Sequence, residues 1–226
     1  MSRSLNKIGL FIFFLFLGWI VLIFSAPNYK NTPLPEELKK YEAATFWVCH
    51  ARGCGTGWAF DKNLQTNEVM VVTAGHVCSN EVSSKEPMPV IIANNLVAKR
   101  VYIDKNNDIC VLIIYDPDQK RLLNLAPVVT PEAWTLSRIE LSSYKAQLLK
   151  AYTINLAQGG WCRFFRGAVK PGASGSAMIN VDGEVTCMVV LGFDTIDVGA
   201  CVPKNALEDF LTEVRRTEND RNQYLQ

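Results

Sequence analysis

Three segments of this chain carry side chains whose types and order suit nucleophilic catalysis. His76 stands in Thr-Ala-Gly-His-Val, Asp108 precedes a long apolar run, and Ser174 lies in Pro-Gly-Ala-Ser-Gly. A histidine can act as general base near neutral pH, a carboxylate can orient its ring, and a serine hydroxyl can attack a carbonyl carbon. The three positions predict a Ser-His-Asp triad that works through a covalent acyl intermediate.

The general base must be one of only two histidines, His50 and His76. Residues 69–73 are apolar and mostly β-branched, which predicts a buried strand that ends at the small pair Ala74-Gly75. Such a turn leaves the next ring free to point into a cleft. His50 has no small-residue turn after it, and we interpret it as a histidine at a strand edge or on the surface.

Several acidic residues compete for the third role. Asp108 is favoured because the apolar run 109–114 follows it at once, which places its carboxylate at the edge of a buried strand. Asp104 and Asp116 lie near asparagine or proline and are typical of turns.

The serine is flanked by small residues that suit an oxyanion-binding loop. Two backbone N–H groups must face the oxygen that becomes negative, and we expect them to be those of Gly172 and Ser174. Ser176 is a second hydroxyl, which we interpret as structural. A plain glycine-serine turn between two strands would have a similar composition.

The remaining pattern predicts an all-β fold. Short apolar or β-branched runs alternate with turns, and Asp-Gly at 182–183 is a strong hairpin signal. From residue 205 onward, Leu207, Phe210, Leu211 and Val214 recur at helical spacing. We expect a helix that covers the second half of the fold, with fraying of the charged residues after Arg215.

The N-terminus is a separate element. Residues 8–26 are almost entirely apolar, and about 19 residues are long enough to cross a bilayer as a helix. Positive charges precede this segment, so the chain after it is expected on the outer side of the membrane. We interpret residues 1–26 as a membrane anchor followed by a tether at 27–44. The alternative is a cleaved signal peptide.

Composition limits the partners and cofactors. A net charge of +1 gives no reason to expect nucleic acid. The seven cysteines fit an exported chain with disulfides, and their odd number leaves at least one outside an internal bridge. Because Cys-x-x-Cys and paired-histidine spacings are missing, neither a metal site nor a cofactor is expected.

Taken together, these segments resemble those of trypsin-like serine proteases, closer to the bacterial and HtrA-type branch than to digestive trypsins. Gly55-Thr56-Gly57 is similar to the family's Gly-Ser-Gly strand, and the His76, Asp108 and Ser174 segments match its triad motifs in the same order. The resemblance covers about residues 46–212. It implies two six-stranded Greek-key β-barrels with a C-terminal helix, a protease domain at 45–215 and a polar tail at 216–226.

The resemblance also implies a function: a serine endopeptidase acting on proteins or peptides, tethered to the outer face of a membrane. Two departures leave an alternative open. Ala173 replaces the acidic or amide residue that normally precedes the serine, and Ser176 stands where the family has glycine. The chain could therefore be a protease-fold binding protein without activity or, more remotely, an adhesion or assembly module; the sequence does not predict its oligomeric state.

Family positions suggest where specificity and disulfides lie. Ala168 corresponds to the base of the primary pocket, the cavity for the side chain before the cleaved bond, and Gly192 and Gly199 to walls that leave it open. This implies cleavage after apolar or small uncharged residues.

The family's bridge beside the catalytic histidine suggests a pair between Cys54 and Cys78. Cys162 and Cys187 flank the serine segment and form a second candidate pair. Cys110 and Cys201 lie in apolar runs and are expected as buried thiols.

Overall fold

The computed structural model of the chain describes residues 35–50, 53–78, 90–91, 96–128, 132–140, 143–155, 161–166, 171–193 and 198–224. All of these belong to the larger of two compact units, Asn31–Gln226. The expected membrane span at 8–26 and Ala168 lie outside the described residues. In the part of the chain that is described, no helix combines the length and apolar character needed to cross a membrane.

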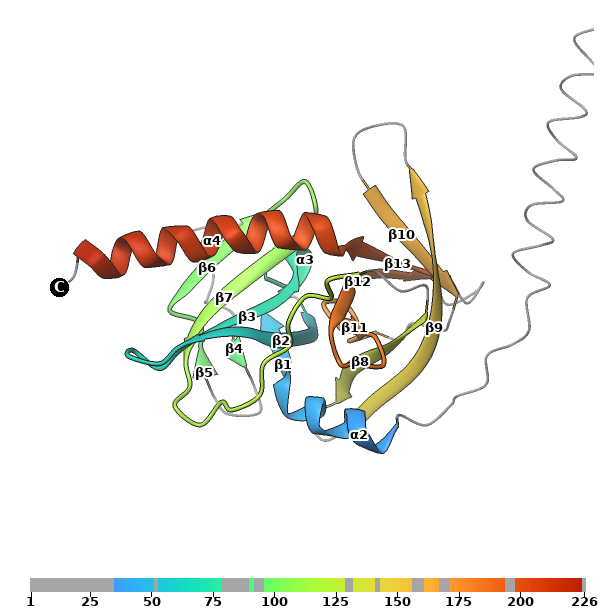
Figure 1. Cartoon of the computed structure of the whole chain (residues 1–226), viewed down its shortest axis with the longest axis horizontal. Helices are drawn as coiled ribbons and strands as arrows, with labels where there is room; N and C mark the ends of the chain where they lie inside the picture. The colour runs from blue at the N-terminus through green and yellow to red at the C-terminus, as the bar shows by residue number, and fades with distance from the viewer. Residues whose placement is uncertain are drawn as a thin grey trace, which may run out of the picture. The chain divides into compact units, whose positions relative to one another are not determined.

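Two antiparallel sheets make up the fold and lie side by side in Figure 1. The first has the strand order β5-β4-β1-β2-β3-β7-β6. Its strands are β1 (Thr45–His50), β2 (Gly53–Asn63), β3 (Glu68–Ala74), β4 (Val90–Ile91), β5 (Leu96–Val97), β6 (Arg100–Asp104) and β7 (Ile109–Tyr115).

The second sheet is a closed barrel of six strands in the order β10-β13-β12-β11-β8-β9, with β9 pairing back to β10. Its strands are β8 (Glu132–Glu140), β9 (Ser143–Asn155), β10 (Trp161–Arg166), β11 (Ala177–Ile179), β12 (Val185–Phe193) and β13 (Val198–Pro203). The predicted β-rich fold in two halves is confirmed. The first half differs from the expected six-stranded barrel, because seven strands pair there and, among the described residues, its end strands β5 and β6 do not meet.

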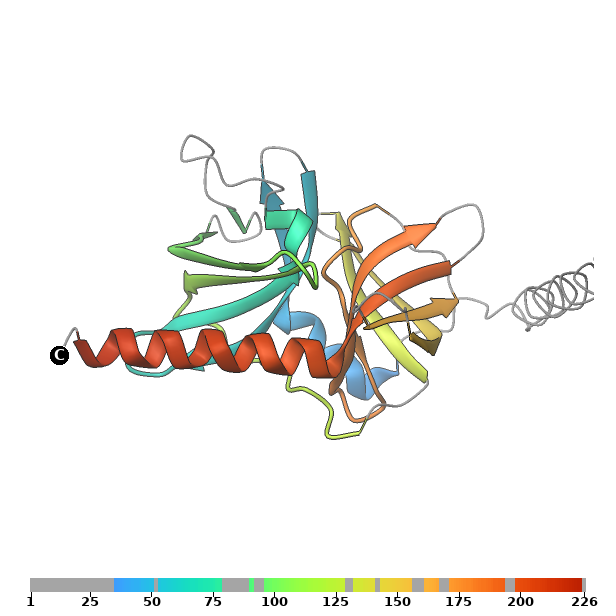
Figure 2. The same cartoon turned by 90° about the horizontal axis from the view of Figure 1, so that it is seen from above.

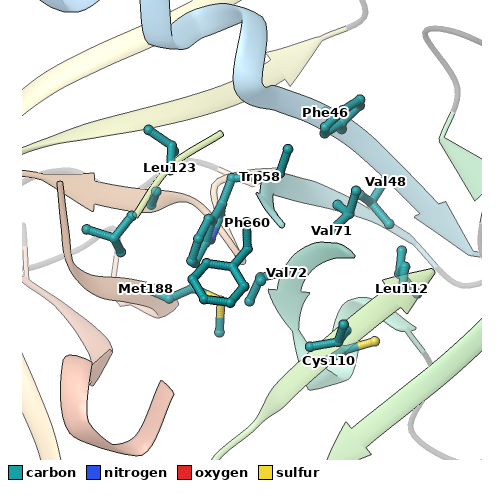
Figure 3. Packing of buried hydrophobic residues seen from close by; sticks show 14 of the residues in the cluster. Phe46, Val48, Trp58, Phe60, Val71, Val72, Cys110, Leu112, Leu123 and Met188 are labelled. Atoms are coloured by element: carbon teal, nitrogen blue, oxygen red, sulfur yellow. The ribbon is translucent and has the colours of Figure 1, made fainter. Parts of the chain in front are cut away.

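One hydrophobic core joins the two sheets. Figure 3 shows Trp58 of β2 with Phe60 beside it and Met188 of the second sheet close by. The Trp58 and Phe60 rings meet edge to face, with centroids 6.0 Å apart. Trp58, Met188 and Leu123 are fully buried, and each such side chain contributes about 1.5 to 3 kcal/mol to folding. The seam between the sheets is therefore a packed interior.

The C-terminal helix α4 (Lys204–Tyr224) packs against β7, β12 and β13, so it crosses both sheets and does not cover the second alone. Figure 2 shows it leaving the end of β13 and running along the first sheet. The predicted apolar stripe is confirmed, since Leu207, Leu211 and Val214 are buried. The expected fraying after Arg215 was wrong, because the helix continues to Tyr224.

A buried ionic cluster explains why the helix persists. Glu218 of α4 is 4% exposed and accepts hydrogen bonds from Arg100 Nε at 2.7 Å and from Tyr102 Oη at 2.5 Å. Arg100 also pairs with Glu68, with Nη2 to Oε2 at 2.8 Å. Burial opposes the charge on Glu68, yet its hydrogen bonds with Arg100 keep the pKa of that carboxyl below its ordinary value.

The segment before β1 is folded, although it was expected to be part of a tether at 27–44. It forms α2 (Glu36–Lys39) and a 3-10 turn η1 (Lys40–Ala44). Tyr41 Oη donates to the Asp182 carbonyl at 3.1 Å, and its ring fills the space where a Cβ at Gly183 would stand, 2.0 Å from Cε2. The segment packs because Gly183, with φ of +82°, gives the ring a flat surface.

Three disulfides join Cys49 to Cys54, Cys78 to Cys110 and Cys187 to Cys201. The proposed pairs of Cys54 with Cys78 and of Cys162 with Cys187 were wrong, as was the assignment of Cys110 and Cys201 as thiols. Strand register is the reason. Cys54 lies directly opposite Cys49 in the β1–β2 hairpin, and Cys187 and Cys201 are on adjacent strands. The three bridges leave Cys162 outside them, and its side chain is not among those described.

Replacing Arg100 with methionine should destabilise the fold by about 3 to 5 kcal/mol, because Glu218 would remain buried without its cation and Glu68 would keep only its longer contact with Lys99, at 3.4 Å. Urea unfolding at pH 7 measures this loss. Arg215→Met is the matched control: its pair with Asp61 is half-exposed, and the expected loss is about 1 kcal/mol or less.

The same comparison has a pH dependence. The lowered pKa of Glu68 gives stability that is present above the carboxyl's unfolded pKa and is lost as pH falls through the folded value. The difference in free energy of unfolding between wild type and Arg100→Met should therefore become smaller as the pH falls. Equal losses for the two arginine variants at pH 7 would contradict the buried cluster.

Removing Cys78 and Cys110 together, as alanines, should cost about 3.5 kcal/mol by loop entropy, because the bridge closes 32 residues. The Cys49–Cys54 bridge closes only 5 residues, and its removal should cost about 2 kcal/mol. Peptide mapping without reductant tests the pairing itself. A peptide linking Cys54 to Cys78 would contradict the structure.

Candidate active site

The position of His76 follows from the pairing of β3 with β7. Ala74, the last residue of β3, lies opposite Ile109, the first of β7, so the next residues out are Gly75 and Asp108. The Gly75 N–H donates to the Asp108 carbonyl at 2.8 Å. A Cβ at Gly75 would lie 2.8 Å from Asp108 Oδ1, and this close approach requires glycine. His76 is the second residue of the short helix α3 (Gly75–Cys78).

Both oxygens of the Asp108 carboxylate hold His76. Oδ1 accepts the His76 backbone N–H at 2.8 Å, and Oδ2 lies 2.8 Å from Nδ1 of the ring. With Nδ1 engaged, Nε2 is the nitrogen available to exchange a proton with a substrate or nucleophile. The two side chains are 39% and 37% exposed, so the pair lies at the surface, where a substrate can reach it.

A turn presents Asp108 to the imidazole. The preceding carboxylate, Asp104, accepts the N–H groups of Asn106 and Asn107 at 2.9 and 3.2 Å, as its interpretation as a turn residue requires. Asp108 itself has φ of +55°, in the left-handed region that few non-glycine residues adopt. Asp116 also caps a turn, accepting the Asp118 N–H at 3.0 Å. Of these acids, Asp108 is the one that meets a histidine.

Ser174 lies in a tight turn whose two ends are glycines with positive φ, +94° at Gly172 and +85° at Gly175. The turn packs closely on the first sheet. A Cβ at Gly175 would lie 2.1 Å from the Thr56 carbonyl and 2.9 Å from the backbone nitrogen of Ala74, two residues before His76. Only glycine fits here, since both the backbone angle and the space exclude a side chain.

The serine turn also approaches the residue after His76. A Cβ at Gly55 would meet the Ser174 carbonyl at 2.7 Å and a methyl of Val77 at 2.6 Å. The structure thus brings the segments of His76, Asp108 and Ser174 to one place. Among the described residues, Ser174 Oγ makes no hydrogen bond to the imidazole. The Ser174 turn and the His76–Asp108 pair are therefore adjacent but not joined by a hydrogen bond. Catalytic hydrogen bonds are often long before substrate binds.

The amides expected to bind an oxyanion have no competing backbone partner among the residues that the structure describes. Within the described part of the chain, the N–H groups of Gly172 and Ser174 donate to no backbone carbonyl. The Ala173 carbonyl is turned the other way, accepting the Ser176 N–H at 3.0 Å. Because a trans peptide points its C=O and N–H in opposite directions, the Ser174 N–H faces away from Ser176.

Ser176 has the structural environment that the sequence suggested. Its side chain is buried and donates a hydrogen bond to Ser137 Oγ of β8 at 2.8 Å. Sequence reasoning did not single out Ser137, since a strand serine carries no signal for a partner 39 positions away. The other histidine, His50, ends β1 half-buried, and Asp108 is paired with His76 instead.

The pocket residues are placed only in part. Gly192 and Gly199 lie opposite each other on β12 and β13. A Cβ at Gly199 would lie 2.2 Å from Cζ of Phe165, and the role of this glycine as a pocket wall stays a prediction. The buried Phe165 ring fills the space beside that glycine.

No family model and no curated protein matches the sequence. In three dimensions, the chain is similar to Rv3671c from M. tuberculosis H37Rv. An inactive serine-to-alanine mutant superposes with a TM-score of 0.65 and 17% identity over 82% of this chain and 96% of that chain. The inactive form gives 0.62 and 18% over 80% and 96%, and the active form 0.63 and 17% over 83% and 92%.

These values relate folds, since the identities are only 17–18%. Rv3671c is a protease with solved active and inactive forms, built on the chymotrypsin fold. The similarity covers nearly all of that chain and includes both sheets of the present one. The chain therefore has the chymotrypsin-like fold that its sequence resemblance implied.

Proposed function

We propose that the chain is a serine endopeptidase that cleaves peptide bonds with His76, Asp108 and Ser174. The observation that carries the proposal is the pair of hydrogen bonds that join Asp108 to the ring and the backbone of His76. This pair lies next to the tight Ser174 turn. A carboxylate that fixes the tautomer and orientation of an imidazole is the support that a general base requires. The similarity in fold to a protease adds to it.

In the proposed reaction, His76 Nε2 removes the proton from Ser174 Oγ as that oxygen attacks the substrate carbonyl. Asp108 stabilises the imidazolium that forms, and the amides of Gly172 and Ser174 bind the oxyanion. His76 then protonates the leaving amine, and an acyl-enzyme remains. Water, activated by the same imidazole, releases the acid.

The compartment is proposed on two grounds. Three disulfides are typical of proteins that fold in an oxidising environment. The apolar segment at 8–26 would hold the chain at the membrane, with the protease domain (45–215, together with the rest of α4) outside.

Two observations support a second candidate function. Ser174 Oγ is not hydrogen-bonded to His76 among the described residues, and Ala173 and Ser176 depart from the family pattern. A protease-fold binding protein that has lost its chemistry would show the same features. Such a protein would bind peptides at the same site without cleaving them.

Fluorophosphonate labelling separates the two functions. The full chain, purified in detergent, should be labelled at Ser174, and Ser174→Ala should abolish the signal. Asp108→Asn should lower kcat by about 10⁴-fold, because it removes the charge that stabilises the imidazolium and the oxygen that fixes the tautomer. Hydrolysis of a peptide library measures the second effect.

The matched control is Asp104→Asn, which alters a turn carboxylate four residues away that does not meet His76. Its activity should stay within a few-fold of wild type. Unlabelled but folded wild-type protein would overturn the enzyme proposal in favour of the binding protein.

We also propose that the primary pocket takes small uncharged side chains. Phe165 occupies the space beside Gly199, and Ala168 supplies no charge. A peptide library should therefore show cleavage after alanine, glycine, serine or valine. Phe165→Ala should enlarge the pocket and raise cleavage after leucine and phenylalanine by about tenfold, as expected for one or two buried methylenes. Preferred cleavage after lysine or arginine would contradict this assignment.

A further inference from the structure

Thr56 of β2 makes two hydrogen bonds to the turn that carries Ser174. Its hydroxyl Oγ1 donates to the Gly172 carbonyl at 2.8 Å, and its backbone N–H donates to the Ser174 carbonyl at 2.8 Å. We propose that Thr56 is a positioning residue that fixes the oxyanion-binding amides of this turn. The proposal rests on the proposed serine protease function.

The two bonds, with a third from within the turn, fix successive peptide planes. Thr56 Oγ1 holds the plane that contains the Gly172 carbonyl, and the Ser176 N–H holds the next one through the Ala173 carbonyl at 3.0 Å. The Thr56 N–H holds the third plane through the Ser174 carbonyl. The Ser174 N–H belongs to the middle plane, so its direction is set from both sides.

Of the residues in this turn, Gly172 depends most on the hydrogen bond from Thr56. With φ of +94°, it has the wide conformational freedom of a glycine, and its N–H is one of the two expected oxyanion donors. A hydrogen bond to its carbonyl restrains rotation about its ψ angle. The hydroxyl of Thr56 supplies that bond from a different sheet.

Thr56 is itself held in place. Its own carbonyl accepts a hydrogen bond from Thr73 Oγ1 at 2.7 Å, and both threonine side chains are fully buried. Thr73 belongs to β3, three residues before His76. A chain of hydrogen bonds therefore runs from the strand of the general base, through Thr56, to the turn of the nucleophile.

The neighbouring glycines allow the contact. Gly55 faces the Ser174 carbonyl so closely that a Cβ there would lie 2.7 Å away, so β2 can reach the turn with main chain and a short side chain. Valine at position 56 would keep the branched shape and lose the donor, so the half-buried Gly172 carbonyl would lose its hydrogen bond from β2. Serine would keep the donor and lose one methyl.

The test compares Thr56→Val and Thr56→Ser in the full chain, on the best peptide substrate of the wild type. Thr56→Val should lower kcat by 10- to 100-fold with KM changed by less than threefold, because the amides act on the transition state. Thr56→Ser should stay within fivefold of wild type. Thr186→Val is the matched control: this buried threonine also bonds a main-chain carbonyl, that of Met178 at 3.2 Å, and should leave kcat unchanged.

A second readout separates positioning from general loss of structure. A peptide aldehyde forms a hemiacetal whose oxygen occupies the oxyanion position, whereas the matching peptide acid binds as a product. Thr56→Val should weaken the aldehyde in parallel with kcat/KM and leave the acid unchanged. A purely structural role would lower the fraction of active enzyme, measured by fluorophosphonate titration, and leave both affinities of the remainder intact.

The outcomes are distinct. Wild type that takes no fluorophosphonate defeats the proposed function. Active wild type with a Thr56→Val variant that keeps kcat within threefold, or with Thr186→Val equally impaired, defeats the positioning role alone. If Thr56→Val does not fold, Thr73→Val decides, since it removes the support of the Thr56 carbonyl. A loss of 3- to 10-fold in kcat with parallel weakening of the aldehyde supports the role, and an unchanged kcat overturns it.

Discussion

The register between β3 and β7 is the constraint on which the site depends. Ala74 lies opposite Ile109, so that the residues just beyond the two strand ends are brought together. From there, the Gly75 N–H binds the Asp108 carbonyl, and the Asp108 carboxylate binds His76. A slip of one residue would turn every side chain of a strand to the opposite face of the sheet. Apolar burial of both strands enforces this register, and the chemistry of the site follows from packing.

Local signatures were enough to select segments that the structure brings together, because each triad candidate stands at the end of a distinctive segment. A β-branched run ending in Ala-Gly located His76, and an apolar run starting after Asp108 located its partner. Contacts between distant segments could not be predicted in this way. The cysteine pairs and the Thr56 hydroxyl bond depend on which strands are neighbours, which a single sequence does not state. The helix end was missed for the same reason, since Glu218 appeared solvated until Arg100 was placed beside it.

The two sheets are joined by several kinds of interaction. The core contains Trp58 from the first sheet and Met188 from the second, and α4 lies across both. Polar contacts reinforce the joint where the serine turn meets β2 and the end of β3. A site assembled between two halves needs such a joint, because a shift of about 1 Å between reacting groups can cost a hundredfold in rate. The Cys78–Cys110 bridge adds a covalent tie within the half that carries His76 and Asp108.

The docking of Tyr41 on Gly183 makes the segment before β1 a further link between the two sheets. Tyr41 lies several residues before β1, and its ring and hydroxyl contact the hairpin between β11 and β12. The chain that enters β1 of the first sheet is thereby also attached to the second sheet, at the hairpin that follows Ser174.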